Sequence, residues 1–311
     1  AVNSGTSALQ LALHLVKSYD GESVLLPPLS CFASTSAVIA NNMVPRWVDI
    51  DPKTLLMNLT HLESKLDKDT RIILIVHFAG RTPDYNRLNS ILDKHQLKFG
   101  FRPIVIEDCA QSLGSITNIH EFGGSVGLSG NICCFSFQAV KTLTTGDGGA
   151  IVLPNKELYE RAKKLRWYGY DRDLNIKNQS ISESGFKYHM NDINATIGIC
   201  NLKYLKDKDI FGQQIENYGL LLDEFNINDY GVPCNGQFPV IIRKSLFDKL
   251  TEKMSQNGIE CLPAHFRCDK HYCVKKYRAA LPGMDYVESR MTMLPCGWWV
   301  NDVELERIIS I

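Results

Sequence analysis

The sequence has no excess of charge of either sign and no long apolar run. Lysine plus arginine number 34 and aspartate plus glutamate number 34, so the formal net charge is zero. A balanced chain has no strong field to gather nucleic acid or acidic lipid, and we expect no nucleic-acid partner. The apolar stretch from Ala8 to Val16 is interrupted by Gln10 and His14. We therefore expect neither a signal peptide nor a membrane span.

Signatures of metal and nicotinamide sites are also missing. The ten cysteines include no C-x-x-C pair, which indicates a reduced, cytoplasmic protein. The set nearest to a metal site is Cys261, His265, Cys268, His271 and Cys273. Its spacing matches no standard zinc pattern, so no metal is expected. The glycines between residues 123 and 130 lack the G-x-G-x-x-G spacing, which argues against a nicotinamide oxidoreductase.

Short β-rich runs alternate with helical patterns in the first two-thirds of the chain, which predicts βαβ units and a mostly parallel sheet. The expected strands are Ser23–Leu26, Pro45–Ile50, Arg71–Phe78, Ile104–Glu107, Asn131–Phe137 and Ala150–Leu153. The expected helices are Ser7–Lys17, Ser34–Asn41, Leu62–Leu66, Tyr85–His95 and Lys156–Tyr168. Thr60 with Glu63 predicts a capping box, and Asn155 predicts a helix N-cap.

The remainder of the chain predicts a second domain. From Asp192 to Phe225 the pattern is mainly helical, and shorter elements with several glycines and prolines follow. We place a boundary near Gly212. The expected architecture is a large α/β domain over residues 1–212 and a smaller α+β domain over residues 213–311.

Asp108 comes at the end of an apolar predicted strand, where open α/β sheets place ligand-binding groups. A carboxylate there can pair with the pyridinium nitrogen of pyridoxal phosphate (PLP). The pairing keeps that nitrogen protonated, so that the ring accepts electrons when a substrate Cα–H bond breaks. An acidic residue after a strand can equally be a helix cap or a metal ligand, so Asp108 alone does not decide.

The segment Asn3-Ser4-Gly5-Thr6-Ser7 leads directly into a predicted helix. Backbone N–H groups at a helix start favour a phosphate, although a plain N-cap has the same pattern. Farther along, Lys141 follows a buried predicted strand and precedes a glycine-rich turn. Desolvation makes such an amine nucleophilic enough for a Schiff base, while a lysine before a turn is often only solvent-exposed.

Together these elements resemble the DegT/StrS-type family of PLP-dependent nucleotide-sugar aminotransferases. The matching segments are residues 4–9, 48–51, 77–80, 107–112, 135–149 and 185–192. The resemblance implies an aspartate-aminotransferase-like fold (fold type I), a homodimer with active sites at the subunit interface, and a nucleotide-linked keto-sugar that receives an amino group, with glutamate as donor.

The same resemblance assigns roles to individual residues. Lys141 would hold PLP as a Schiff base, and Asp108 would pair with the ring nitrogen. Gln111 would meet the ring hydroxyl and Phe32 would stack on the ring. The residues implied to hold the phosphate are Gly5, Thr6, Ser7 and Ser136. Those implied to contact substrate or the neighbouring subunit are Lys187, His189 and His265.

The sequence departs from the family pattern at several places. Relatives often have Asn at position 187, Arg at position 189 and Asp at position 131, where this chain has Lys187, His189 and Asn131. The family also has a helical segment before the phosphate motif, and we expect that segment to be missing here. Two alternatives stay open: a catalytically silent regulatory or sensor protein, and a PLP-dependent sugar dehydratase. Dehydratases of this kind have His at the lysine position, so Lys141 argues against the second.

Overall fold

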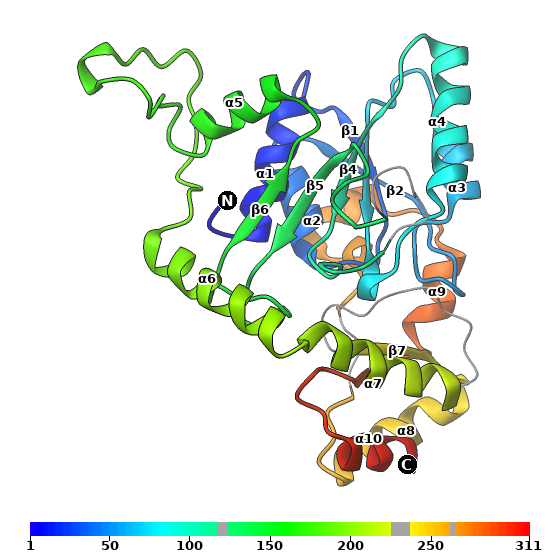
Figure 1. The fold of residues 1–311 in the computed structure, drawn as a ribbon. Coiled ribbons are helices and arrows are strands. Elements are labelled where there is room, and N and C mark those ends of the chain that lie inside the picture. Colours follow the sequence, from blue (N-terminus) through cyan, green and yellow to red (C-terminus); the bar gives the residue numbers. More distant parts are fainter. Residues whose placement is uncertain (117–123, 225–236, 262–264) are drawn as a thin grey trace.

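The computed structural model describes residues 1–116, 124–224, 237–261 and 265–311. Its centre is a six-stranded sheet in the order β2-β1-β3-β4-β5-β6, with helices on both faces (Figure 1). The strands are β1 (Ser23–Leu26), β2 (Val44–Trp47), β3 (Ile72–Val76), β4 (Ile104–Asp108), β5 (Ile132–Ser136) and β6 (Gly149–Val152). All neighbouring strands are parallel except β5 and β6. The predicted mostly parallel sheet is confirmed.

The helices of this part follow the predicted order. They are α1 (Gly5–Val16), α2 (Phe32–Ala40), α3 (Leu59–Lys65), α4 (Tyr85–Phe99), α5 (Lys156–Leu165), α6 (Asp192–Asp207) and α7 (Ile210–Glu224). The predicted N-cap at Asn155 is confirmed, because its side chain accepts from the N–H of Leu158. The predicted capping box of Thr60 is wrong. Asn58 caps α3 by accepting from two backbone N–H groups, so the helix begins before Thr60.

Alternate residues of each buried strand enter different cores. Val24 and Leu26 of β1 pack with α1 and α2 on one face of the sheet, while Leu25 packs with α3 and α4 on the other. This alternation follows from the period of two in a β-strand. Because both faces are covered, a strand such as β3 is buried at all five residues.

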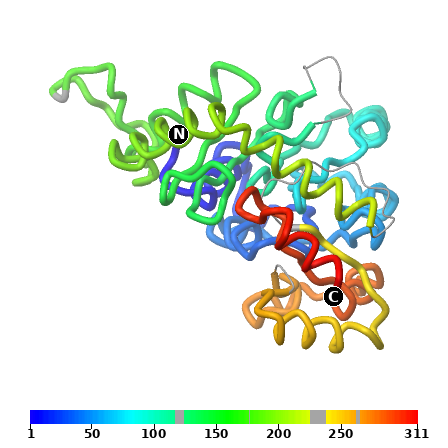
Figure 2. The backbone as a smooth tube through the Cα atoms, turned by 60° about the horizontal axis from the view of Figure 1, so that its bottom comes forward, coloured from blue at the N-terminus to red at the C-terminus, as the bar shows by residue number. Residues whose placement is uncertain are grey.

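The C-terminal part contains a second, two-stranded antiparallel sheet. Its strands are β7 (Gln237–Ile241) and β8 (Met291–Pro295), and its helices are α8 (Lys244–Gln256), α9 (Pro282–Glu288) and α10 (Asp302–Ile309). Buried residues of α7, β7, α8, β8 and α10 form one apolar core. Figures 1 and 2 place α8 and α10 at the end of the molecule opposite the segment that follows α5.

The hydrophobic cores do not divide at the boundary proposed near Gly212. Gly212 lies in the first turn of α7. Buried residues from Cys268 to Met293 pack into the same core as α1 and α2. The division at residue 212 therefore stays a prediction, and part of residues 213–311 is tied to the large sheet. Among the described residues, no helix combines the length and apolarity needed to cross a bilayer.

Candidate active site

The carboxyl ends of β4 and β5 place two of the predicted residues at one edge of the sheet. Asp108 is the last residue of β4 and Ser136 the last residue of β5. The two strands are parallel, with Asp108 beside Cys134. Ser136 therefore lies only two residues farther along the neighbouring strand. This is the edge where parallel α/β sheets bind ligands.

The Asp108 carboxylate is buried and partly hydrogen-bonded. Its Oδ2 atom accepts from the Ser34 hydroxyl at 2.6 Å, and its Oδ1 atom accepts from the backbone N–H of Ala110 at 3.1 Å. An ionised carboxylate offers about four acceptor positions, so these two bonds leave capacity for a ligand cation. Sequence reasoning did not single out Ser34, because a serine inside a largely apolar helix carries no signal of its partner.

Gln111 contacts both the segment after β3 and the C-terminal part of the chain. Its Oε1 atom accepts from the backbone N–H of Ala79 at 2.8 Å, which directs the amide nitrogen toward His265 Nε2 at 3.2 Å. His265 then accepts at Nε2. Burial lowers the pKa of His265, as does the nearby positive charge of Lys141, while Asp108 acts in the opposite direction. The structure thus brings Lys141, Asp108, Gln111 and His265 together.

The start of α1 lies directly against the end of β5. A Cβ atom added to Gly5 would come within 2.7 Å of the Ser136 Cβ, so only glycine permits this approach. The Ser4 hydroxyl caps the helix and accepts from the N–H of Ser7. Among the described residues, the N–H groups of Gly5 and Thr6 have no protein acceptor. Two such donors beside the Ser136 hydroxyl fit a phosphate group.

Lys141 lies in the turn between β5 and β6. Its backbone N–H donates to the carbonyl of Gln138 at 2.9 Å, and Gly146 farther along the turn has a φ of 79°. Beyond the turn is a cleft of about 1090 Å³, bordered by Lys141, Tyr204 of α6 and Trp298 of the C-terminal part. Lys141 therefore borders this cleft and also lies near His265.

The predicted residues Lys187 and His189 lie together on Trp167. The Lys187 ammonium is 4.0 Å from the Trp167 ring centre, and the His189 ring meets the same indole edge-on at 3.7 Å. Burial, together with the positive charge of Lys187 nearby, lowers the pKa of His189. The side chain of Asn3 donates to the Lys187 carbonyl, which ties this segment to the start of α1. Trp167 could not be predicted as part of this group, because its role depends on pairing with Lys187, twenty residues away.

Phe32 is the first residue of α2 and packs against the main core. Its ring lies 4.5 Å from that of His271, at an interplanar angle of 62°. This contact already uses one side of the Phe32 ring. Stacking of Phe32 on a cofactor ring stays a prediction.

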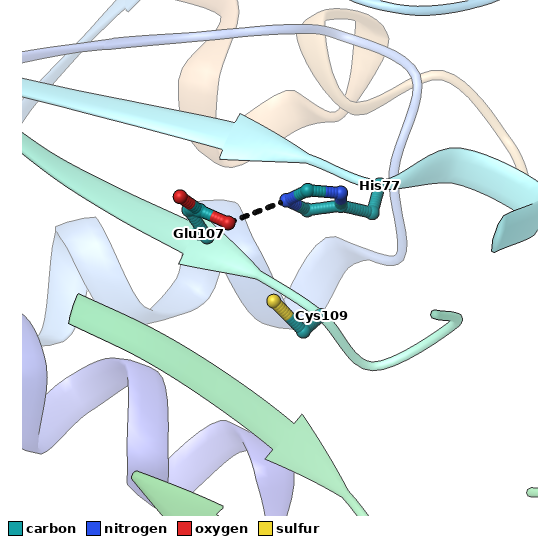
Figure 3. Close-up of side chains that lie close together, drawn as sticks. All are labelled: His77, Glu107 and Cys109. Carbon is teal, nitrogen blue, oxygen red and sulfur yellow. Dashed lines mark hydrogen bonds and ion pairs between the residues drawn. The ribbon is translucent and has the colours of Figure 1, made fainter. Parts of the chain in front are cut away.

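A second buried cluster lies on the other side of β4 (Figure 3). His77 Nε2 is 2.9 Å from Glu107 Oε2, and the thiol of Cys109 is close to both. Three further donors point at the Glu107 carboxylate, from Tyr85, Ser129 and Asn131. Burial raises the pKa of the Cys109 thiol well above its usual value. A carboxylate filled by donors and a protonated thiol form a hydrogen-bonded cluster and do not suit a cation.

The residues considered for zinc do not assemble into one site. Cys261 Sγ is 3.0 Å from the Thr292 hydroxyl, Cys268 Sγ contacts the Ser30 carbonyl, and His265 contacts Gln111. Each of these three side chains thus has its own protein partner.

Comparison with solved structures supports the fold. The chain superimposes on AtS13 from Actinomadura melliaura with a TM-score of 0.92 and 37% identity, covering 99% of this chain and 84% of that one. It superimposes on the sugar aminotransferase CalS13 from Micromonospora echinospora with a TM-score of 0.91 and 32% identity, covering 99% and 85%. The predicted fold-type I architecture is confirmed.

Sequence comparison identifies the family. The chain is 34% identical to GDP-perosamine synthase from Escherichia coli O157:H7 over 206 residues, 66% of this chain and 53% of that protein. It thus spans about half the length of the curated relatives that it matches. A model of the DegT/DnrJ/EryC1/StrS aminotransferases, which depend on PLP, matches residues 1–311. This confirms the predicted cofactor at the level of the family. The chain belongs to the DegT/DnrJ/EryC1/StrS aminotransferase family.

Proposed function

We propose that this protein is a PLP-dependent aminotransferase that converts a nucleotide-linked keto-sugar to an amino-sugar in the cytoplasm, with glutamate as amino donor. The observation that supports it is that Lys141, Asp108 and Gln111 lie close together, beside the place where the start of α1 meets Ser136 at the end of β5. The similarity to CalS13 and to GDP-perosamine synthase, both named for sugar chemistry, favours a sugar as the acceptor.

In this proposal the Gly5 and Thr6 N–H groups and the Ser136 hydroxyl would hold the cofactor phosphate, with Ser7 beside them. Asp108 would hold the proton of the ring nitrogen, and Gln111 would donate to the ring hydroxyl. When bound, PLP would supply the electron sink that amino-group transfer requires. The Lys141 amine would be the point of covalent attachment.

The positions of two arginines favour a sugar over a small keto acid. An aminotransferase for small amino acids needs an arginine free to bind the α-carboxylate. Arg267 is instead buried among carboxylates, with bonds to Asp269 at 2.7 and 2.8 Å, and it also pairs with Asp285 and Glu288. Arg290 lies over the Tyr286 ring at 4.2 Å.

We also propose a homodimer with shared active sites. Helix α6 exposes large apolar side chains on one face, including Ile193 at 74% and, one turn on, Ile197 at 41% of their full accessible area. Such an apolar helix face is typical of an interface. The connection between α5 and α6 extends away from the body of the molecule (Figure 1), and Lys187, near its end, lies where it returns to the start of α1. In the dimer, Lys187 and His189 would meet the phosphate or substrate of the neighbouring site, and His265 would face the sugar.

The proposal is tested first by covalent trapping. Purified protein incubated with PLP is treated with borohydride, digested and mapped by mass spectrometry. We expect the adduct on Lys141, no adduct in Lys141→Ala, and an unchanged adduct in the matched variant Lys177→Ala, which alters an exposed lysine. A cofactor adduct on another lysine would overturn the assignment.

The substrate is tested by a panel of acceptors. Protein in the aminated cofactor form is offered UDP-, dTDP- and GDP-linked 4-keto-6-deoxy sugars, and separately pyruvate and oxaloacetate, while the cofactor absorbance is followed. We expect turnover with at least one nucleotide-linked sugar and regeneration by glutamate. Turnover with the plain keto acids alone refutes the sugar assignment, and cofactor binding without turnover favours the sensor reading.

A further inference from the structure

The Asp108 carboxylate is hydrogen-bonded to a short chain of buried hydroxyl groups. Ser34, in the first turns of α2, donates to Asp108 Oδ2 at 2.6 Å. Ser30 lies behind it, with the two hydroxyl oxygens 2.7 Å apart, and the Ser30 hydroxyl is also 2.6 Å from the Cys31 carbonyl. Ser30 and Ser34 are each only 1% exposed.

The number of hydrogens restricts how this chain can be ordered. Each serine hydroxyl has one hydrogen. When Asp108 is ionised it only accepts, so the Ser34 hydrogen must point at Oδ2. The single Ser30 hydrogen is then shared between the Ser34 oxygen at 2.7 Å and the Cys31 carbonyl at 2.6 Å. The chain therefore supplies the ionised carboxylate with a donor at Oδ2.

We propose that Ser34 is a positioning residue that fixes the Asp108 carboxylate and favours its ionised form, with Ser30 supporting it from behind. A hydrogen bond to the charged form of an acid stabilises that form. The ionised carboxylate in turn keeps the proton on the nitrogen that it faces. This inference rests on the proposed function, because it needs a cofactor ring nitrogen opposite Asp108.

Geometry supports a role for Ser34 beyond packing. The Asp108 Oδ1 atom is held by the N–H of Ala110, so the Ser34 bond at Oδ2 completes a two-point attachment. Two bonds to different oxygens set the rotation of the carboxylate about its Cβ–Cγ bond. Without Ser34 the group keeps one attachment and can rotate, and one oxygen remains buried without its donor.

The test compares Ser34→Ala with Ser34→Thr, which retains a hydroxyl, and with Ser36→Ala on the same helix as a control. The readouts are kcat, PLP affinity and the ¹⁵N chemical shift of PLP labelled at the ring nitrogen. For Ser34→Ala we expect kcat to fall about tenfold, the effect of losing one bond to a charged group. We also expect the ¹⁵N signal to move toward the unprotonated position. Ser34→Thr should restore both, and Ser36→Ala should change neither.

Ser30→Ala is the second variant, and it keeps the inference testable if Ser34→Ala does not fold. It should move the ¹⁵N signal in the same direction by a smaller amount. A folded Ser34→Ala protein with wild-type kcat and an unchanged ¹⁵N signal overturns the inference. Failure of the wild-type protein to bind PLP would instead refute the proposed function, so the two failures are distinguishable.

Discussion

Two adjacent carboxylates of β4 face opposite sides of the sheet and meet different surroundings. Glu107 is fully buried and accepts four hydrogen bonds, from His77, Tyr85, Ser129 and Asn131. Asp108 accepts two, from Ser34 and the Ala110 N–H. A carboxylate has about four acceptor positions, so Glu107 is saturated by the protein and Asp108 is not. The contrast separates a structural acid from one that is available to a ligand.

The largest effect should come from Asp108→Asn. An amide cannot hold the proton of a pyridinium nitrogen, so kcat should fall roughly 10²- to 10³-fold, the usual result of removing one electrostatic stabiliser. Cofactor binding and the melting temperature should change little, because the amide oxygen can accept from the Ala110 N–H while the amide nitrogen donates to the Ser34 hydroxyl oxygen. Steady-state kinetics, PLP titration and thermal unfolding check this. Near-normal turnover would remove Asp108 from the site.

Glu107→Gln should show the opposite pattern. One Gln amide group replaces an acceptor oxygen and faces donors, so the free energy of unfolding should fall by about 3 kcal/mol, as when a buried pair is broken. The kcat of the folded protein should stay within a few-fold of wild type. Glu63→Gln, which breaks the exposed pair with Lys94, is the control and should be nearly neutral. Equal losses of stability in the two variants would contradict the structural role of Glu107.

Asn131→Asp places a second carboxylate against Glu107, where the Asn131 amide donates at 2.7 Å. We expect a loss on the order of 2 kcal/mol at neutral pH, since two like charges cannot both stay ionised there. Denaturant unfolding at pH 7 measures the loss, with Asn131→Ser as the neutral control.

The pH dependence of the same variant follows from the Glu107 environment. Burial alone raises the pKa of Glu107, but bonds led by His77 lower it to about 2, below the usual 4.5. Its stabilisation of the wild-type protein is therefore complete above about pH 4.5 and is lost as pH falls toward 2. In Asn131→Asp the folded protein binds a proton more tightly, so its deficit should shrink as pH falls from 7 toward 4. A deficit that is constant with pH would rule out charge repulsion as the cause.

The smallest effect is expected for Tyr85→Phe. It removes one of the four donors to Glu107, the 2.7 Å bond from the Tyr85 hydroxyl. The free energy of unfolding should fall by about 1.5 kcal/mol, the contribution of one bond to a charged group. The kcat should not change, because the hydroxyl lies on the face of β4 away from Asp108. A loss of kcat without a loss of stability would mean that the two faces are coupled.

The order of strands and helices could be predicted from the sequence, because apolar runs and helix caps are strong local patterns. Apolar runs such as Ile72–Val76 and the cap at Asn155 were placed correctly to within a few residues. The error at Thr60 arose because Asn58 offers an equally good cap two residues earlier. Local patterns cannot choose between two competent caps, since the choice depends on how the helix packs.

The candidate site was predicted as a set of residue types, and the structure supplied their partners. Lys141, Asp108 and Gln111 were predicted as site residues, and the structure brings them together with His265. The bond from Ser34 to Asp108 could not have been predicted, because the two residues are 74 positions apart in the chain.

The sequence alone determined that the sheet is mostly parallel, which cofactor class the chain uses and which residue types lie at the edge of the sheet. The parallel sheet follows from periodicity, whereas the cofactor class and the site residues follow from the resemblance of the motifs to a known family. Only the tertiary structure decided which face of β4 each carboxylate occupies and how many donors it meets. Adjacent residues of a strand point to opposite faces, and the donors come from helices and turns distant in sequence. The different environments of Glu107 and Asp108 are therefore a property of packing and not of sequence position.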